Sequence, residues 1–252
     1  MKIINLIRAD FMKMRHTSFY CIHICIPIIG ILVFWGYYSY SVWSAESKVL
    51  AYLEVISIVF PFLIGILCSM VVEQEFMAGR FKEILSTEWG TRTNILSKII
   101  MLLLMGLFSL ILAIGGFLIG FQFILKQNVL PLSFFVYSTL FIFISQIFLY
   151  LFHLWLSLFL GKGASIGMAI FESLCSALLL TGLGGRVWYF IPCAWAARFC
   201  DYFFANYVDP IGMAGIISEV NIGIISSIVI TIIFGIFLGI WLNFFEGRED
   251  KA

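Results

Sequence analysis

The chain has 252 residues, of which 62% are hydrophobic and only 12% are charged. Soluble globular proteins average about 45–50% and about 25% respectively, so this composition excludes a soluble enzyme or binding domain. The formal net charge of +1 gives no sign of a nucleic-acid partner, and we expect none.

The first predicted element is an amphipathic helix over residues 1–16. At 100° per residue, its apolar and polar side chains separate onto two faces, Ile3, Ile4, Ile7, Phe11 and Met14 against Lys2, Asn5 and Lys13. Such a helix lies in the plane of the membrane interface, with its basic residues toward lipid phosphates. The alternative is an ordinary basic flank of the first span.

Six long apolar stretches dominate the rest of the chain. They cover residues 18–42, 55–72, 95–121, 132–160, 164–183 and 222–242. A bilayer core of about 30 Å is crossed by about 20 apolar residues in a helix, because lipid cannot pair free backbone groups. The sequence therefore predicts an all-α polytopic membrane protein with six transmembrane helices, in a single transmembrane domain over residues 1–252.

Lys and Arg alternate from one side of these spans to the other. One side holds eleven of the 15, namely Lys2, Arg8, Lys13, Arg15, Arg80, Lys82, Arg92, Lys98, Lys162, Arg248 and Lys251. The other holds Lys48, Lys126, Arg186 and Arg198. By the positive-inside rule, both termini are predicted to be cytoplasmic.

The segment 73–94, between the second and third spans, would then also be cytoplasmic. Glu73 and Glu75 close the second span, and apolar residues recur after them with helical spacing among charges. We expect a short helix that ends at Gly90, followed by a third span capped by Thr91 or Thr93. This helix either docks onto a cytoplasmic partner or is a solvated connector. The candidate coupling residues are Glu73, Glu75, Phe76, Gly79, Arg80, Phe81, Lys82, Ile84 and Leu85.

The outer segment 184–221 is far longer than the about 4–6 residues needed to join two helices. Because backbone at membrane depth must be helical or buried in protein, we expect one or two short helices that dip back into the outer leaflet. Its aromatic residues form either an interfacial belt or a surface that contacts substrate. The candidate contacts are Trp188, Tyr189, Trp195, Arg198, Phe199, Asp201 and Tyr202.

Ionisable residues inside a membrane are costly and are read as functional by default. Glu172 in the fifth span and His153 in the fourth fit a proton-coupled carrier, or a hydrogen-bonded acid inside the bundle. No HExxH, GxSxG or GxxxxGK[ST] motif is present, so we expect no catalytic residue, no metal and no ATP hydrolysis by this chain alone.

Small residues and cysteines give two further expectations. Three Gly-x-x-x-Gly pairs, Gly116/Gly120, Gly163/Gly167 and Gly235/Gly239, allow helices to approach closely, although such pairs arise easily by chance. Cys193 and Cys200 fall in the outer segment, where they either pair or remain buried free thiols.

The most specific pieces of sequence are Glu73-x-Glu75-x-x-x-Gly79-Arg80-Phe81, Ile84-Leu85-Ser86, Ser97-Lys98 and the tail from Trp241 to Arg248. With six spans and cytoplasmic termini, the whole chain resembles the permease subunits of ABC-2 type transporters. It is more closely similar to the lantibiotic-protection permeases of Gram-positive bacteria. Many ABC-2 permeases carry Pro two residues after the Leu-Ser pair, where this chain has Thr87-Glu88-Trp89.

The resemblance implies a type V exporter-like fold, with an interfacial N-terminal helix, a coupling helix in segment 73–94 and re-entrant outer helices before the last span. It implies a separate ATPase partner, in two copies, that binds ATP and Mg²⁺, and a second permease that makes a heterodimer or homodimer. The expected place is the plasma membrane of a Gram-positive bacterium, surrounded by lipid, and the expected activity is removal of lantibiotic peptides to the outside. Two other classes stay open, an ion- or proton-coupled carrier and a non-transporting sensor or scaffold.

Overall fold

The computed structural model describes residues 2–86, 90–127, 130–213 and 215–248, which form helices joined by short connections. The α-helices are α1 Lys2–Lys13, α2 Phe19–Tyr40, α3 Ala45–Gly79, α4 Lys82–Ser86, α5 Gly90–Phe123, α6 Leu132–Phe159, α7 Lys162–Leu180, α8 Trp195–Val208, α9 Pro210–Met213 and α10 Ile217–Trp241. Single 3₁₀ turns are η1 Met14–His16, η2 Gly182–Gly184, η3 Trp188–Phe190 and η4 Pro192–Ala194.

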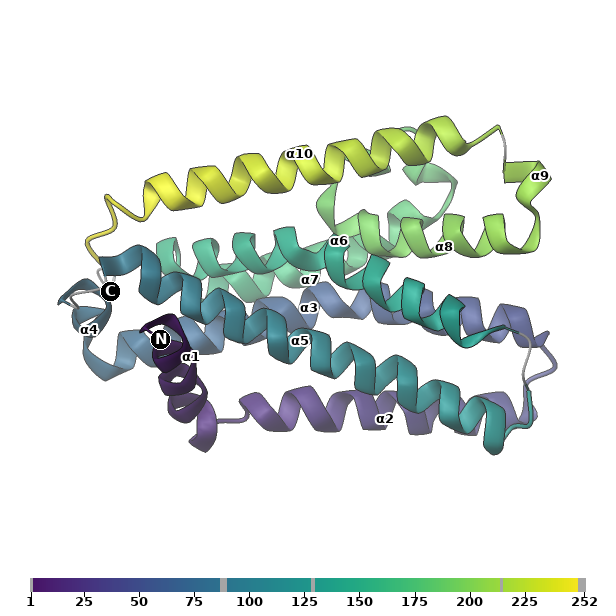
Figure 1. Ribbon diagram of the computed structural model, residues 1–252, viewed down its shortest axis with the longest axis horizontal. Helices are drawn as coiled ribbons and strands as arrows, with labels where there is room; N and C mark the ends of the chain where they lie inside the picture. Colours follow the sequence, from purple (N-terminus) through teal and green to yellow (C-terminus); the bar gives the residue numbers. More distant parts are fainter. Residues whose placement is uncertain (1, 87–89, 128–129, 214, 249–252) are drawn as a thin grey trace.

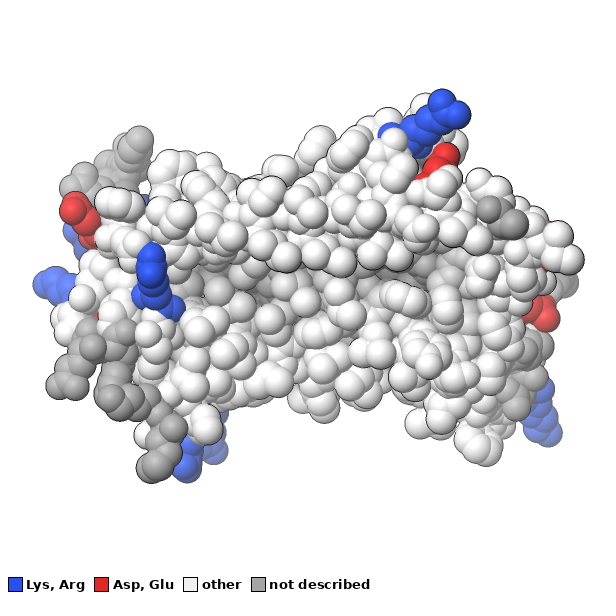
Figure 2. Space-filling view, turned by 45° about the horizontal axis from the view of Figure 1, so that its top comes forward, with Lys and Arg blue, Asp and Glu red and all other residues white. Residues whose placement is uncertain are grey.

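Six of these helices, α2, α3, α5, α6, α7 and α10, are long and apolar enough to cross a membrane, which confirms the six predicted spans. They run along the length of the molecule (Figure 1). Both ends of the chain and α4 lie at one end, called here the terminal end, and α8 and α9 lie toward the other, the far end. On the face seen in Figure 2, charged residues sit near the two ends and an uncharged band separates them.

Two spans are longer than their apolar stretches predict. The helix α3 has 35 residues and α5 has 34. The added turns carry polar residues that find partners: Lys48, for example, is buried and donates to the Tyr38 carbonyl at 3.2 Å. An apolar run therefore marks the part of a helix that avoids water, whereas the helix continues for as long as its backbone and side chains are satisfied.

The core is built around α3. It packs against α6, α7 and α8, while α2 lies along α5. In the most apolar window of α3, 56% of the residues are buried, compared with 11% for α10. The last span thus lies at the edge of the bundle and shows most of its surface to the outside (Figure 1).

The outer segment is helical, as predicted, although the last span begins at Ile217 rather than at residue 222. The 14-residue helix α8 turns back beside α6, and the first half of α8 is buried. Cys193 and Cys200 are buried free thiols, which decides between the two alternatives for them.

Of the three Gly-x-x-x-Gly pairs, only Gly116/Gly120 supports a close contact. Ile31 and Trp35 of α2 lie directly over these two glycines, and a Cβ on Gly120 would overlap the Trp35 indole. Trp35 Nε1 also donates to the Phe117 carbonyl at 3.3 Å. At the other two pairs a Cβ would meet nothing within 4 Å, except at Gly235, where it would lie 3.9 Å from Leu151.

We expect Gly120→Leu to destabilise the protein by about 1–3 kcal/mol, because Trp35 must leave its place on α5. The measurement is thermal unfolding of the purified protein in detergent. Gly167→Leu is the matched control, since nothing lies within 4 Å of a Cβ there. Equal melting temperatures for the two variants would contradict the prediction.

Candidate coupling site

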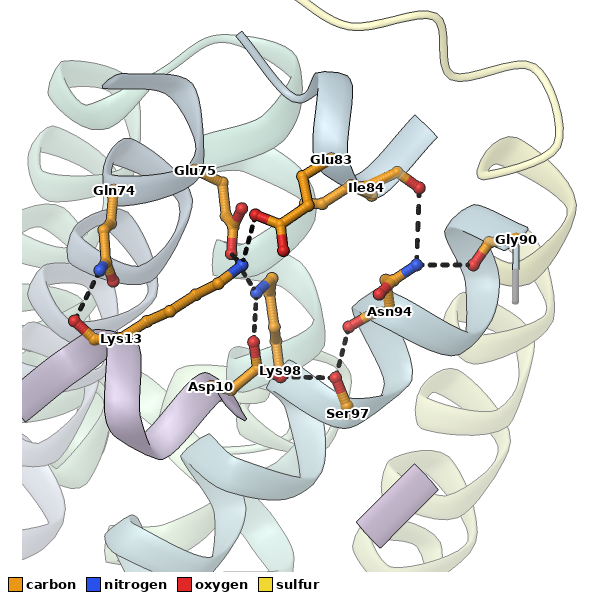
Figure 3. Close-up of polar contacts among 10 residues, drawn as sticks. All are labelled: Asp10, Lys13, Gln74, Glu75, Glu83, Ile84, Gly90, Asn94, Ser97 and Lys98. Carbon is orange, nitrogen blue, oxygen red and sulfur yellow. Dashed lines mark hydrogen bonds and ion pairs between the residues drawn. The ribbon is translucent and has the colours of Figure 1, made fainter. Parts of the chain in front are cut away.

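Four helices meet at the terminal end. The helix α1 lies crosswise to the spans and packs against the start of α5 (Figure 1). The last turns of α3 and the short helix α4 close around the same place. Polar side chains from all four helices point toward one another there (Figure 3), and we call this set the coupling network.

The ammonium of Lys98 is at the centre of the coupling network. Lys98 Nζ lies 2.5 Å from Asp10 Oδ1 and 2.6 Å from Glu75 Oε1. The three side chains are 5%, 7% and 3% exposed. Buried charges are tolerated only when they are paired, so Lys98 fixes α5 to α1 on one side and to α3 on the other.

Lys13 extends the coupling network to α4. Its Nζ lies 3.0 Å from Glu75 Oε1 and 2.9 Å from Glu83 Oε2. Partial burial works against the charged amine, but the bonds to Glu83 and Glu75 outweigh it and raise the pKa of Lys13 above its ordinary value. Two ammonium groups thus alternate with three carboxylates, and only Glu83 is well exposed, at 64%.

Further hydrogen bonds complete the arrangement. Ser97 Oγ donates to Asp10 Oδ2 at 2.5 Å, so both oxygens of this carboxylate are used. Gln74 Nε2 donates to the Lys13 carbonyl at 2.6 Å, next to the end of α1. Asn94 Nδ2 donates to the Gly90 carbonyl at 3.1 Å and reaches the Ile84 carbonyl of α4 at 3.5 Å. Side chains of α3 and α5 thus hold α1 and α4 by their backbones as well.

The turn between α3 and α4 has an unusual backbone. Gly79, Arg80 and Phe81 all have positive φ, at 157°, 50° and 65°. The Arg80 amide donates back to the Phe76 carbonyl at 2.7 Å and ends α3. Left-handed conformations at non-glycine residues cost about 1–3 kcal/mol each and persist only where the surroundings enforce them. Here the Phe81 ring is buried, 5.7 Å from Phe76 and 5.5 Å from Phe245.

The segment after α10 joins the same end of the molecule. Arg248 Nη1 donates to the Ser157 carbonyl of α6 at 2.8 Å, and Nη2 lies 3.4 Å from Glu73 Oε2. Its guanidinium also lies 4.5 Å from the centre of the Phe76 ring. Arg248 therefore connects the end of the last span to α3 and α6.

The structure divides the predicted coupling residues into two groups. Glu75, Phe76, Phe81 and Ile84 are buried and Glu73 is half-buried, whereas Gly79, Arg80, Lys82 and Leu85 are exposed. The predicted helix is reduced to the five residues of α4. Thr91 and Thr93 lie inside α5 and cap nothing, so that prediction was wrong. The Thr87–Trp89 departure from the family pattern lies outside the described residues.

Asp10 was missed as a site residue, and Lys13 was misplaced. Lys13 binds Glu75 and Glu83 instead of facing lipid phosphates. The signal for Asp10 was in the sequence: at 100° per residue it falls beside Ile3 and Met14, on the apolar side of α1. An acid on that side of the helix predicts a buried partner.

The candidate substrate contacts of the outer segment are mostly core residues in this structure. Trp188, Trp195 and Phe199 are buried. Trp188 packs over Gly223 of α10, so it holds the last span to the bundle. Tyr189, Asp201 and Tyr202 are half-buried, and their contact with substrate stays a prediction.

Arg198 has a structural role here. Its Nε donates to the Leu179 carbonyl at 2.8 Å and its Nη2 to the Thr181 carbonyl at 2.6 Å. These carbonyls lie at the C-terminal end of α7, where a positive charge is favourable. Asp201, one turn further along α8, lies 3.9 Å from Arg198, and burial raises the pKa of Asp201 while this guanidinium opposes the change.

The two ionisable residues singled out inside the spans lie together. His153 Nε2 of α6 is 2.6 Å from Glu172 Oε2 of α7, and both side chains are buried. This pair lies within the spans α6 and α7, and neither residue belongs to the coupling network.

Comparison with known proteins agrees with this architecture. The profile of a family described as "ABC-2 family transporter protein" matches residues 6–176, which run from α1 into α7. No curated protein and no solved structure matches the chain. The match covers more than half of the sequence, so the chain belongs to the ABC-2 transporter family, whose members are the membrane components of ABC transporters and in general carry no catalytic site.

We expect Lys98→Met to lower the free energy of unfolding by about 3–5 kcal/mol, because Asp10 and Glu75 lose the charge between them. Thermal unfolding in detergent measures this, with the exposed Lys82→Met as the matched control. Adding Asp10→Asn to Lys98→Met should recover part of the loss, since Glu75 keeps Lys13. A Lys98→Met protein as stable as the control would contradict the role given to this ammonium.

Proposed function

We propose that the chain is the permease subunit of an ABC exporter and that its terminal end receives the movement of a separate ATPase. The observation that supports this most directly is the coupling network. It joins α4, which reaches the surface, through the exposed Glu83 and the partly buried Lys13 to the buried charges that connect α1, α3 and α5. A displacement of α4 would therefore be transmitted to the long spans α3 and α5 and to the crosswise helix α1 together.

The orientation follows from the same proposal. ATP is in the cytoplasm, so the surface that meets the ATPase faces the cytoplasm, and both termini lie on that side with it. The distribution of Lys and Arg supports this independently, because eleven of 15 fall on the side of the termini. The far end, with α8 and α9, then faces outward.

The surface around α4 has the composition of a docking site. Met77 is 77% exposed and Leu85 is 37% exposed, and the charged residues Arg80 and Lys82 lie beside them at the surface. Phe81 and Ile84 point inward and anchor the same segment. An exposed apolar pair with charges around it is typical of protein interfaces, where a buried centre has a polar rim.

A photoreactive amino acid at position 85 should cross-link, in intact membranes, to a protein that carries a GxxxxGK[ST] motif. The same amino acid at position 211, which is 88% exposed at the far end, is the control and should not reach that protein. Leu85→Asp should lower the amount of ATPase that stays with the purified complex at least about tenfold, since about 1.4 kcal/mol is enough for that.

Glu75→Gln serves to separate docking from transmission. Its side chain is 3% exposed and does not reach the surface, so the ATPase should still bind. ATP hydrolysis should no longer respond to the permease, because Lys13 of α1 and Lys98 of α5 lose the carboxylate that holds both helices to α3. Normal coupling in Glu75→Gln would count against the coupling network as the path.

For the transported molecule we propose lantibiotic-type antimicrobial peptides, moved out of the membrane to the outside. The support is the resemblance carried by segment 73–86 and the tail from Trp241 to Arg248, together with the aromatic outer segment. Such peptides are amphipathic and act at the outer leaflet, so capture would come sideways from lipid. A second related permease, or a second copy of this chain, would complete the complex with two ATPase subunits.

Cells without this protein should become more sensitive to lantibiotics, with little change toward unrelated drugs. Tyr189→Ala and Tyr202→Ala should reduce protection while the amount of protein in the membrane stays normal, because both side chains are only half-buried. Trp188→Ala should instead lower protein levels, because its indole fills the core beneath α10. If both tyrosine variants protect like the wild type, the outer segment is not in the substrate path.

A further inference from the structure

A cleft of about 370 Å³ lies between α6, α7 and η4. Its walls include Phe148 and Phe152 of α6 and Phe171 of α7, and Glu172 also lines it. The rim residues Phe171 and Leu178 are 58% and 52% exposed, so the cleft opens sideways, where lipid surrounds the spans. A carboxyl group in an aromatic cleft at this depth is unusual and points to a function.

The direction of the hydrogen bonds places one shared proton on the pair. The Gly65 carbonyl can only accept, so Ser165 Oγ donates to it, at 3.2 Å. His153 Nδ1, 3.1 Å from this hydroxyl, must then carry the hydrogen that it donates. A neutral His153 therefore turns an unprotonated Nε2 toward Glu172 Oε2, at 2.6 Å, and one further proton is shared between these two atoms.

With that shared proton the pair has no net charge, and without it the pair has one negative charge. Two thiols face Glu172, Cys175 of α7 and Cys193 of η4. From α3 the cluster receives only the Gly65 carbonyl. Among the described residues that line the cleft there is no Lys or Arg, so nothing on its walls neutralises the pair once the proton leaves.

We propose that this cleft binds a lipophilic organic cation, whose charge replaces the shared proton. The cation enters from the side, its apolar groups pack against the phenylalanine rings, and its charge lies near the Glu172 carboxylate. One proton leaves the His153–Glu172 pair for water as one cation enters, so the net charge of the site is unchanged. A lipid acyl chain would match the walls of the cleft but would leave the carboxyl group without a role.

This site does not rest on the proposed function. It shares no residue with the coupling network, and its test uses the purified full-length chain without any ATPase. Failure of the test would leave the assignment of the coupling site as it stands.

The probe is radiolabelled tetraphenylphosphonium, measured by equilibrium dialysis with the chain in detergent. We expect saturable binding of one cation per chain. The dissociation constant should fall as the pH rises, by up to about tenfold per pH unit, because one proton is released for each cation bound. Tetraphenylborate, an anion of the same shape, is the matched control and should bind far more weakly.

Two variants with matched controls locate the site. Glu172→Gln should lower the affinity for tetraphenylphosphonium at least about tenfold and remove its pH dependence, while Glu54→Gln, in α3 and outside the cleft, should do neither. Phe171→Ala should weaken binding several-fold through loss of a ring contact, while Phe108→Ala, 49% exposed on α5, should not.

Because Phe171 is mostly exposed, its variant keeps the test valid even where Glu172→Gln does not fold. If tetraphenylborate binds as tightly as tetraphenylphosphonium, or if Phe171→Ala leaves the affinity for tetraphenylphosphonium unchanged, the cleft is only an apolar groove of the kind that a lipid chain fills. Either result would overturn the proposal, as would the absence of saturable binding by the wild type.

Discussion

The buried ammonium of Lys98, shared between Asp10 and Glu75, is the interaction on which the terminal end depends. A single unpaired charge at this depth would cost several kcal/mol, so none of the three residues can move away alone. The bonds also have direction, and they fix how α5 is rotated relative to α1 and α3. Apolar packing by itself would leave these helices free to slide.

This constraint explains why α3 extends beyond its apolar stretch. Glu75 lies past residue 72, so α3 must continue for its carboxylate to meet Lys98 in the third turn of α5. The turn of α5 that precedes its apolar stretch carries Asn94, which bonds the Gly90 and Ile84 carbonyls. The far end is built differently. Aromatic packing around Trp188 and the Arg198 bonds to the end of α7 hold it, and α10 touches the bundle over a small part of its surface. A rigid terminal end and a lightly packed last span are suited to a protein that moves some helices against others.

The His153–Glu172 pair contrasts with the coupling network. In the coupling network each buried charge meets an opposite charge, so the whole set is satisfied and serves to hold helices together. In the span pair a single proton stands between two groups, and one of them lines an open cleft. A proton can be exchanged for another cation, whereas a lysine side chain cannot leave. The free-energy cost of a buried charge therefore holds helices together in the coupling network, and it creates a binding site at the His153–Glu172 pair.

The sequence by itself determined the number of spans, the all-α class and the amphipathic N-terminal helix. These follow from hydropathy and helical period, which are local properties of the chain. It did not determine that Asp10 meets Lys98, 88 residues away, or that His153 meets Glu172. It also assigned Trp188 and Trp195 to a surface, whereas both are in the core. Hydropathy indicates that a side chain avoids water, but it does not tell whether that side chain contacts lipid or protein instead. Only the packing of helices far apart in sequence decided which apolar faces are covered by other helices and which charged side chains form pairs.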